Sequence, residues 1–230
     1  AMSQKTFGQA LNEALTIAME IDETVFIAGE GVGVSIPQDP NMATHGLLEK
    51  FGPGRVKDTP VSEAAIAGLA VGASCMGLRP VVEIMFFPFI TLASDMLVNH
   101  AGKLRYLSGG KSSFPLTVRV KAGVGFGAGS QHSHNLEAWI AHSPGLKIVW
   151  PATPEDAKGM LLSAIFDPDP VIVVQVDAVG IDRALADQAV VLVGAEVAAR
   201  VREELRVQRD LVDVLREVRL DEGRRVLGGE

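Results

Sequence analysis

The stretch RVKDTPVSEAAIAGLAVGASCM, residues 55–76, predicts a short strand, a turn and a helix in immediate succession. Residues 55–58 suit a strand, and the small apolar residues that follow suit a helix that ends at Gly77. Ser62 is a suitable N-cap residue, and Glu63 falls in the first turn, where the helix dipole favours a negative charge. A strand that leads directly into a helix indicates an α/β fold.

The same alternation of strand and helix continues on both sides of this stretch. Short apolar runs suit buried strands, and longer segments with apolar residues at helical spacing suit helices. The expected strands are 25–28, 55–58, 80–85, 116–121, 147–150 and 171–176. The expected helices are 6–22, 47–51, 62–76, 89–107, 136–142 and 154–165. This order predicts an α/β fold with a mainly parallel sheet and helices on both of its faces.

The chain of 230 residues is therefore expected to hold one full domain and a smaller second part. Residues 1–176 contain the whole alternating pattern and form the first domain. Residues 177–230 repeat it weakly, with apolar runs at 190–193 and 211–215 around a charged helical segment. We interpret this tail as a truncated C-terminal α/β remnant, because it is too short for a complete domain.

Composition and charge exclude several classes of function. A net charge of −7 provides no basic surface for nucleic acid or for an anionic membrane. The single cysteine, Cys75, excludes an intramolecular disulfide and fits a reducing compartment, so we expect a cytoplasmic protein. No apolar run approaches the roughly 18 residues that span a bilayer, and residues 1–3 do not resemble a signal peptide.

The candidate functional residues lie where the expected strands end. In open α/β sheets, binding sites gather at the carboxyl edge of the sheet. Four segments fall there, namely 29–33, 59–63, 86–89 and 129–134. They would bring a carboxylate, an aromatic ring and a histidine close together.

Each of these residues also has a purely structural interpretation. Glu63 could serve only as a charge at a helix N-terminus, and Phe89 could belong to the core. His132 lies in a glycine-rich loop, where a histidine needs no core partner, so a functional role is favoured there. The role of His134 stays open. Residues 29–33 match part of a dinucleotide-binding motif, but the spacing is wrong, which argues against a nicotinamide-dependent oxidoreductase.

The run DTPVSEAAIAGLAVG, residues 58–72, strongly resembles the β subunit of the thiamin-diphosphate-dependent first component of 2-oxo-acid dehydrogenase complexes. The resemblance is to the pyruvate, branched-chain and acetoin types. Further matches follow in chain order at residues 46–52, 77–83, 103–110, 131–133, 144–147 and 156–159. The resemblance covers about residues 6–175 and implies a transketolase-like pyrimidine-binding domain.

The resemblance also implies roles for the candidate residues. Glu63 matches the glutamate that hydrogen-bonds N1′ of the aminopyrimidine and so favours the imino form that removes the C2 proton of the thiazolium. Phe89 matches the aromatic residue that stacks on the pyrimidine, and Glu30 and Val61 match positions that line the same pocket. His132 matches the active-site histidine that handles protons or substrate oxygen near the reacting centre.

By the same resemblance, the chain is one half of an enzyme. In the family, an α subunit binds Mg²⁺ and the diphosphate through a Gly-Asp-Gly…Asn-Asn type motif, which this sequence lacks. We therefore expect thiamin diphosphate with its Mg²⁺ held mainly by a partner chain, and no metal ligand in this chain. The expected assembly is an α₂β₂ heterotetramer.

The expected function is that of the β subunit of a thiamin-diphosphate enzyme that decarboxylates a small 2-oxo acid and is active only with its α partner. The acyl or hydroxyalkyl unit then passes to a lipoyl acceptor or, in an acyloin synthase, to a second carbonyl. The short tail favours the second outlet, because relatives use that region for docking. The alternative is a non-catalytic partner or regulatory remnant, against which the presence of Glu63, Phe89 and His132 argues.

The substrate is expected to contact a wall made partly by this chain. That wall is predicted to include Phe86, Phe87, Gln131, His132 and His134. His134 stands where many relatives carry glutamine. Two histidines two positions apart would suit a polar or carboxylated 2-oxo acid.

Overall fold

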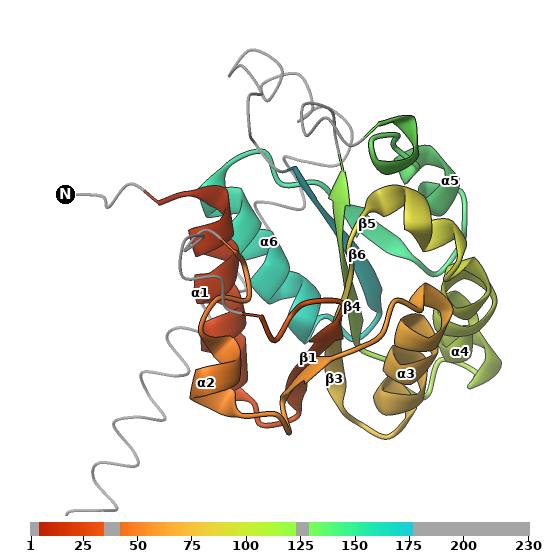
Figure 1. Cartoon of the computed structure of the whole chain (residues 1–230). Helices are drawn as coiled ribbons and strands as arrows, with labels where there is room; N and C mark the ends of the chain where they lie inside the picture. Colours follow the sequence, from red (N-terminus) through yellow and green to blue (C-terminus); the bar gives the residue numbers. More distant parts are fainter. Residues whose placement is uncertain (1–4, 35–41, 123–128, 177–230) are drawn as a thin grey trace, which may run out of the picture. The chain divides into compact units, whose positions relative to one another are not determined.

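Six parallel strands form one sheet in the part of the chain that the structure describes (Figure 1). The structure is a computed structural model and describes residues 5–34, 42–122 and 129–176. The strand order is β2-β1-β3-β4-β6-β5, and every neighbouring pair is parallel, which confirms the predicted sheet. The strands are β1 (Val25–Gly29), β2 (Val56–Asp58), β3 (Arg79–Ile84), β4 (Leu116–Ala122), β5 (Lys147–Val149) and β6 (Pro170–Val176). The predicted remnant at 177–230 lies outside the described residues.

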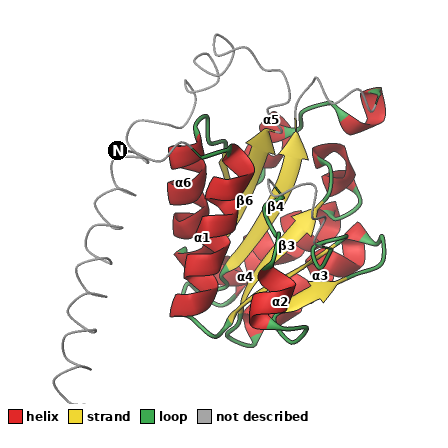
Figure 2. Ribbon diagram, turned by 60° about the vertical axis from the view of Figure 1, so that its left-hand side comes forward, coloured by secondary structure: helices red, strands yellow, loops and turns green. Residues whose placement is uncertain are grey.

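Helices cover both faces of this sheet, as predicted (Figure 2). The α-helices are α1 (Phe7–Ile21), α2 (Leu47–Phe51), α3 (Glu63–Cys75), α4 (Gly102–Leu107), α5 (Glu137–Ala141) and α6 (Pro154–Phe166). α1 and α6 pack against each other on one face, and α3, α4 and α5 lie on the other. Within the described ranges, no helix combines the length and the apolar character that crossing a membrane requires.

The prediction of one continuous α-helix over residues 89–107 is wrong. This part of the chain begins with a 3₁₀ turn, η1 (Phe87–Thr91), and continues as a π-helix, η2 (Asp95–Ala101). It becomes α-helical only in α4. Apolar residues three and four positions apart indicate a helix, but they do not distinguish hydrogen bonds that span three, four or five residues.

The helix predicted over residues 62–76 forms as α3, over Glu63–Cys75. Glu63 is its first residue, and Ser62 occupies the N-cap position. The Ser62 hydroxyl, however, makes no capping hydrogen bond. The backbone N–H of Ser62 instead hydrogen-bonds the carboxyl group of Glu30, which follows β1. This bond links the start of α3 to the end of a neighbouring strand.

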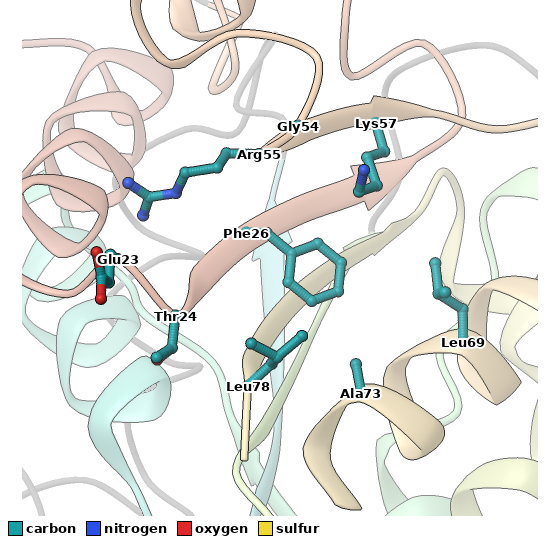
Figure 3. A pocket seen from close by; sticks show the side chains of 9 residues that line it. All are labelled: Glu23, Thr24, Phe26, Gly54, Arg55, Lys57, Leu69, Ala73 and Leu78. Atoms are coloured by element: carbon teal, nitrogen blue, oxygen red, sulfur yellow. The ribbon is translucent and has the colours of Figure 1, made fainter. Parts of the chain in front are cut away.

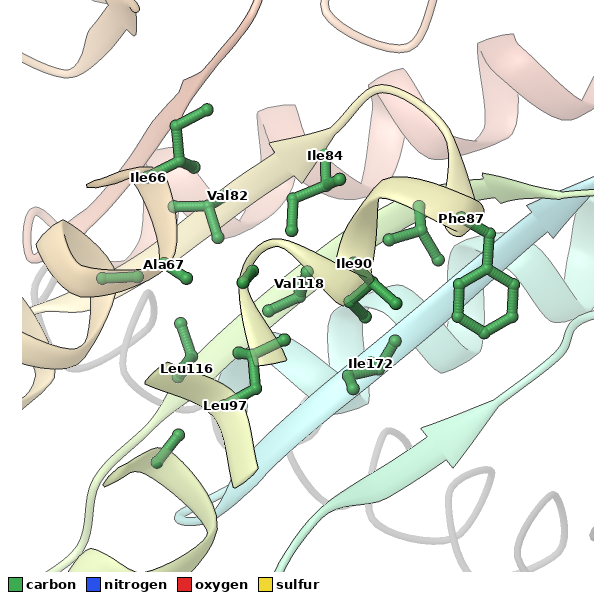
Figure 4. Packing of buried hydrophobic residues seen from close by; sticks show 14 of the residues in the cluster. Ile66, Ala67, Val82, Ile84, Phe87, Ile90, Leu97, Leu116, Val118 and Ile172 are labelled. Carbon is green, nitrogen blue, oxygen red and sulfur yellow. The ribbon is translucent and has the colours of Figure 1, made fainter. Parts of the chain in front are cut away.

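The buried apolar residues on the α3 side of the sheet form one contiguous cluster of the core (Figure 4). It joins β3 and β4 to the 3₁₀ and π segments through fully buried side chains such as Ile84, Phe87, Ile90 and Leu97. All five residues of β1 are buried, so this strand packs on both of its faces. The core therefore holds the carboxyl ends of β1, β3 and β4 firmly in place.

Two glycines allow the start of α4 to touch the chain just before β5. Gly145 has a φ of +95°, and a Cβ atom there would overlap the backbone carbonyl oxygen of Gly102. The contact is continued by Lys103, whose Nζ donates to the carbonyl oxygen of Pro144 at 2.6 Å. Any side chain at Gly145 would force the two backbones apart.

We expect Gly145→Ala to lower the free energy of unfolding by about 1–3 kcal/mol more than Gly110→Ala does. Gly110 is the matched control, because its φ of +75° is also left-handed but a Cβ there meets nothing within 4 Å. Urea denaturation of the two variants measures the difference. Equal losses of stability in the two variants would show that the destabilisation comes from the left-handed backbone conformation and not from the contact with Gly102.

Candidate functional site

The predicted site residues follow strands that are neighbours in the sheet. Glu30 comes directly after β1, and Glu63 begins α3 after β2. Phe89 lies in the 3₁₀ turn after β3, and His132 ends the short turn η3 (Ser130–His132) after β4. Because β2, β1, β3 and β4 are consecutive in the sheet and parallel, these residues share its carboxyl edge.

The two glutamates form a buried pair of carboxyl groups. Glu30 is 8% exposed and Glu63 is 6% exposed. Burial raises the pKa of the Glu30 carboxyl, and the charge of Glu63 raises it further, while the Ser62 hydrogen bond acts in the opposite direction. Oε1 of Glu30 is buried and has no hydrogen-bond partner among the described residues. The carboxyl group of Glu30 therefore holds a proton more readily than an ordinary glutamate does.

An aromatic cluster forms the second part of the site. The ring of His132 lies 4.8 Å from that of Phe86 and 5.1 Å from that of Phe89, centroid to centroid, with edge-to-face angles of 85° and 82°. Phe86 and Phe89 are 6.2 Å apart. Nδ1 of His132 is buried without a hydrogen-bond partner among the described residues. The structure thus brings His132 and Phe89 together, and Phe86 joins them.

Other residues of the predicted pocket wall have different surroundings. Phe87 is fully buried in the core, so its prediction as a wall residue is wrong. Its neighbour Phe86 contacts His132 instead, because consecutive residues of a turn point in different directions. Val61 is 77% exposed, so this chain alone does not enclose it. His134 is exposed, and its Nδ1 lies 3.2 Å from the carbonyl oxygen of Ser130 in its own turn.

A buried polar network that the sequence reasoning missed lies across the central strands. Arg119 on β4 donates to Glu83 on β3 at 2.8 Å and to Gln175 on β6 at 2.7 Å. Arg119 is 1% exposed, and Lys121 lies 4.0 Å from the other oxygen of Glu83. The available signal was a charged or amide residue inside each of three mostly apolar strands. The network links three strands, of which β3 and β4 lead to residues of the site.

A separate hollow of about 250 Å³ lies between β1, β2 and α3 (Figure 3). Its apolar wall consists of Phe26, Leu69, Ala73 and Leu78, and none of the predicted site residues lines it. Arg55 at its rim already donates to the backbone carbonyl oxygens of Met19, Asp22 and Val25. This hollow is therefore a feature of the packing of α3, apart from the carboxyl-edge site.

The carboxyl-edge residues fit an aminopyrimidine ring. Glu30 Oε1 and His132 Nδ1 lack partners that ring nitrogen and amino groups could supply. Phe89 offers an aromatic face, and Glu63 offers a buried carboxyl group. In the described part of the chain, no three His, Cys, Asp or Glu side chains are grouped so that they could hold a metal ion.

The raised pKa of Glu30 makes the stability of the fold depend on pH. Its contribution is fully present below the pKa of an unfolded glutamate, and it is lost as pH rises through the higher pKa of the folded state. We expect Glu30→Gln to gain stability relative to the wild type as pH rises above the ordinary value of 4.5. Denaturation at several pH values measures this. For the exposed control Glu23→Gln, the difference from wild type should stay constant.

Comparison with known proteins gives one family for this part of the chain. The family model described as "Transketolase, pyrimidine binding domain" matches residues 3–176. The β-2 subunit of the rice mitochondrial pyruvate dehydrogenase E1 component is 48% identical over 172 residues, which are 75% of this chain and 45% of that protein. The β subunit of the Bacillus subtilis acetoin:2,6-dichlorophenolindophenol oxidoreductase is 45% identical over 176 residues, with 72% and 52% covered. The chain spans about half the length of these curated relatives.

Solved structures show the same fold. A split-gene transketolase, described as an inactive beta4 tetramer, superposes with a TM-score of 0.59 at 16% identity, over 76% of this chain and 52% of that one. A transketolase from Leishmania mexicana gives 0.58 at 17% identity, with 73% and 24% covered. At such identities the likeness concerns the fold alone.

Proposed function

The chain belongs to the transketolase pyrimidine-binding domain family, and from this membership we propose that it is the β half of a thiamin-diphosphate enzyme that decarboxylates 2-oxo acids. The observation that carries the proposal is the buried pair of Glu30 and Glu63 beside the aromatic cluster of Phe86, Phe89 and His132. The identity of 44–48% to β subunits of pyruvate dehydrogenase E1 components supports it.

The residues of this chain would bind and orient the pyrimidine half of the cofactor. Thiamin diphosphate, when bound, would supply the carbon nucleophile and the electron sink that decarboxylation of a 2-oxo acid requires. Glu63 would hold a proton at N1′ of the aminopyrimidine, in a buried place where water does not compete. Phe89 would pack on the ring, and His132 would place a nitrogen near the substrate oxygen.

A partner chain would complete the site. We propose that an α-type subunit supplies the diphosphate and Mg²⁺ ligands and that two copies of each chain assemble. Exposed apolar side chains at and beside α3 support this, because Val61, Leu69 and Met76 are 77%, 44% and 81% exposed. The pocket role proposed for Val61 also requires a second chain opposite it.

The first test is calorimetric titration of thiamin diphosphate and Mg²⁺ into this chain, alone and together with an α-type chain that co-purifies with it. Binding only to the mixture, followed by release of carbon dioxide from a 2-oxo acid, is the expected result. Tight binding to the chain alone would contradict the proposed division of the site. Binding to the mixture without carbon dioxide release from any 2-oxo acid would indicate a non-catalytic partner.

The fate of the carbon unit follows from a second measurement on the same assembly. Release of the product onto a lipoylated domain would identify a dehydrogenase component. Formation of a hydroxyketone with an added aldehyde would identify an acyloin synthase. The two acceptors are chemically distinct, so a single substrate screen with both present separates the outlets.

A further inference from the structure

We propose that Phe86 is a positioning residue for His132, and that its ring holds the imidazole in the orientation that the reaction needs. The inference rests on the proposed function and deepens it, because His132 is the residue placed near the substrate oxygen. Phe89 also contacts the imidazole, but its ring is already assigned to the aminopyrimidine. Phe86 itself needs no contact with the reacting atoms.

The orientation of the His132 ring is not set by a hydrogen bond at Nδ1. This nitrogen is buried, and it has no hydrogen-bond partner in the part of the chain that the structure describes. Catalytic histidines are usually oriented by a carboxylate or a backbone carbonyl oxygen that accepts from the second ring nitrogen. The orientation of this imidazole must therefore come from the groups packed around it, and two phenyl rings provide that packing.

The three rings are almost mutually perpendicular. The interplanar angles are 85° between Phe86 and His132, 82° between Phe89 and His132, and 84° between the two phenyl rings. The centroid separations of 4.8, 5.1 and 6.2 Å lie in the range of favourable edge-to-face pairs. Because the two phenyl planes are perpendicular to each other, they limit rotation of the imidazole about two different axes. Without Phe86, only the limit set by Phe89 remains.

The turn that carries the two phenyl rings is itself well fixed. Phe86 is the N-cap residue of η1, and its carbonyl oxygen accepts from the backbone N–H of Phe89 at 3.0 Å. Side chains three positions apart in a 3₁₀ turn lie on the same side, which brings the two rings together. Pro88 restricts the backbone inside the turn, and the fully buried ring of Phe87 anchors it in the core. The two phenyl rings are therefore held in place before any ligand binds.

The test replaces Phe86 with leucine, which keeps an apolar side chain but removes the ring. Carbon dioxide release is measured on the complete assembly of both chains, from the 2-oxo acid that the wild type turns over fastest. We expect kcat to fall about 10–100-fold while KM stays close to that of the wild type, because a misplaced catalytic group loses its effect in the transition state. Phe86→Tyr keeps the ring and should recover most of the turnover. A raised KM at unchanged kcat would show that Phe86 only lines the substrate pocket, and would overturn the inference.

A double-mutant cycle shows whether Phe86 acts through His132. His132→Gln removes the imidazole, and Phe86→Leu is then added to it. If Phe86 serves to orient the imidazole, the second substitution should change kcat little in this background, although it lowers kcat about 10–100-fold in the wild type. Equal losses in the two backgrounds would overturn the inference while the proposed function stands.

Phe166→Leu is the matched control. The ring of Phe166 is also partly buried and lies against a polar side chain, with the guanidinium of Arg79 5.5 Å from its centroid. Phe166 ends α6 just before β6, so it lies at the amino edge of the sheet, away from the site. The variant should lower stability in urea and leave kcat unchanged. A fall in kcat as large as that of Phe86→Leu would show a general effect of destabilisation and would contradict the positioning role.

A spectrum of the unaltered chain tests the contact without any change at Phe86. In the full chain with labelled histidine and phenylalanine, nuclear Overhauser signals should connect the ring protons of His132 and Phe86, whose centroids are 4.8 Å apart. The signals that disappear in His132→Gln identify the imidazole. Absence of these connections would overturn this inference alone. A wild-type assembly that releases no carbon dioxide from any 2-oxo acid would overturn the proposed function, and this inference with it.

Discussion

Replacing Glu63 with glutamine should lower the turnover of the assembled enzyme by about 10²–10⁴-fold while the chain stays folded. Glutamine has nearly the same shape and can still hydrogen-bond a ring nitrogen, but it cannot exchange a proton with it. Glu63 is 6% exposed and begins α3, so its side chain is held in place by the helix. Carbon dioxide release from a 2-oxo acid measures the effect.

The control for this experiment is Glu23→Gln, which makes the same change on the exposed turn before β1. It should keep wild-type turnover. Circular dichroism of both variants establishes that the fold is unaltered. A Glu63→Gln protein with full activity would contradict the assignment of Glu63 and leave it as a charge at a helix N-terminus.

The second large effect is expected on stability. Arg119→Met should lower the free energy of unfolding by about 3–5 kcal/mol, because it removes the close cation of the buried Glu83 and leaves only Lys121, at 4.0 Å. Methionine fills much of the space of the arginine side chain, so the loss reports the charge more than a cavity. Urea denaturation of the isolated chain measures it.

A double variant separates charge from packing. In Glu83→Gln with Arg119→Met the remaining buried group is neutral, so part of the lost stability should return. The single variant Glu83→Gln completes the cycle. Equal stability of Arg119→Met and the double variant would show that the network contributes through packing and not through the ion pair.

Much of the fold could be predicted from the order of apolar segments. The strands at the centre of the sheet are short, mostly apolar runs, and the helices have apolar residues at helical spacing, so both kinds of element are distinct in the sequence. The interruption of the predicted helix 89–107 could not be predicted, because a π-helix has the same apolar pattern. The hydrogen bond from the Ser62 backbone N–H to the Glu30 carboxyl group could not be predicted either. Glu30 is 32 residues away in the sequence, and only the tertiary fold brings the two together.

The candidate site, too, could be predicted from the sequence only in part. The chain positions of Glu63, Phe89 and His132 at strand ends follow from the sequence, and the resemblance adds their roles. The contact of Phe86 with His132 and the burial of Phe87 depend on the direction of side chains in a turn, which spacing does not define. The Glu83–Arg119 pair needs the register of β3 on β4, in which these residues are direct partners.

The strand order described above has a consequence for how this site can vary. From β1 the chain moves outward to β2, then returns past β1 to β3 and continues in the opposite direction. β1 and β3 thus flank a topological switch point, the place where open α/β sheets generally offer a binding crevice. Glu30 follows β1 and Phe86 follows β3, so these two residues flank the switch point. Since connectivity creates this opening, new side chains along its rim can change which ring it accepts while the sheet beneath stays the same.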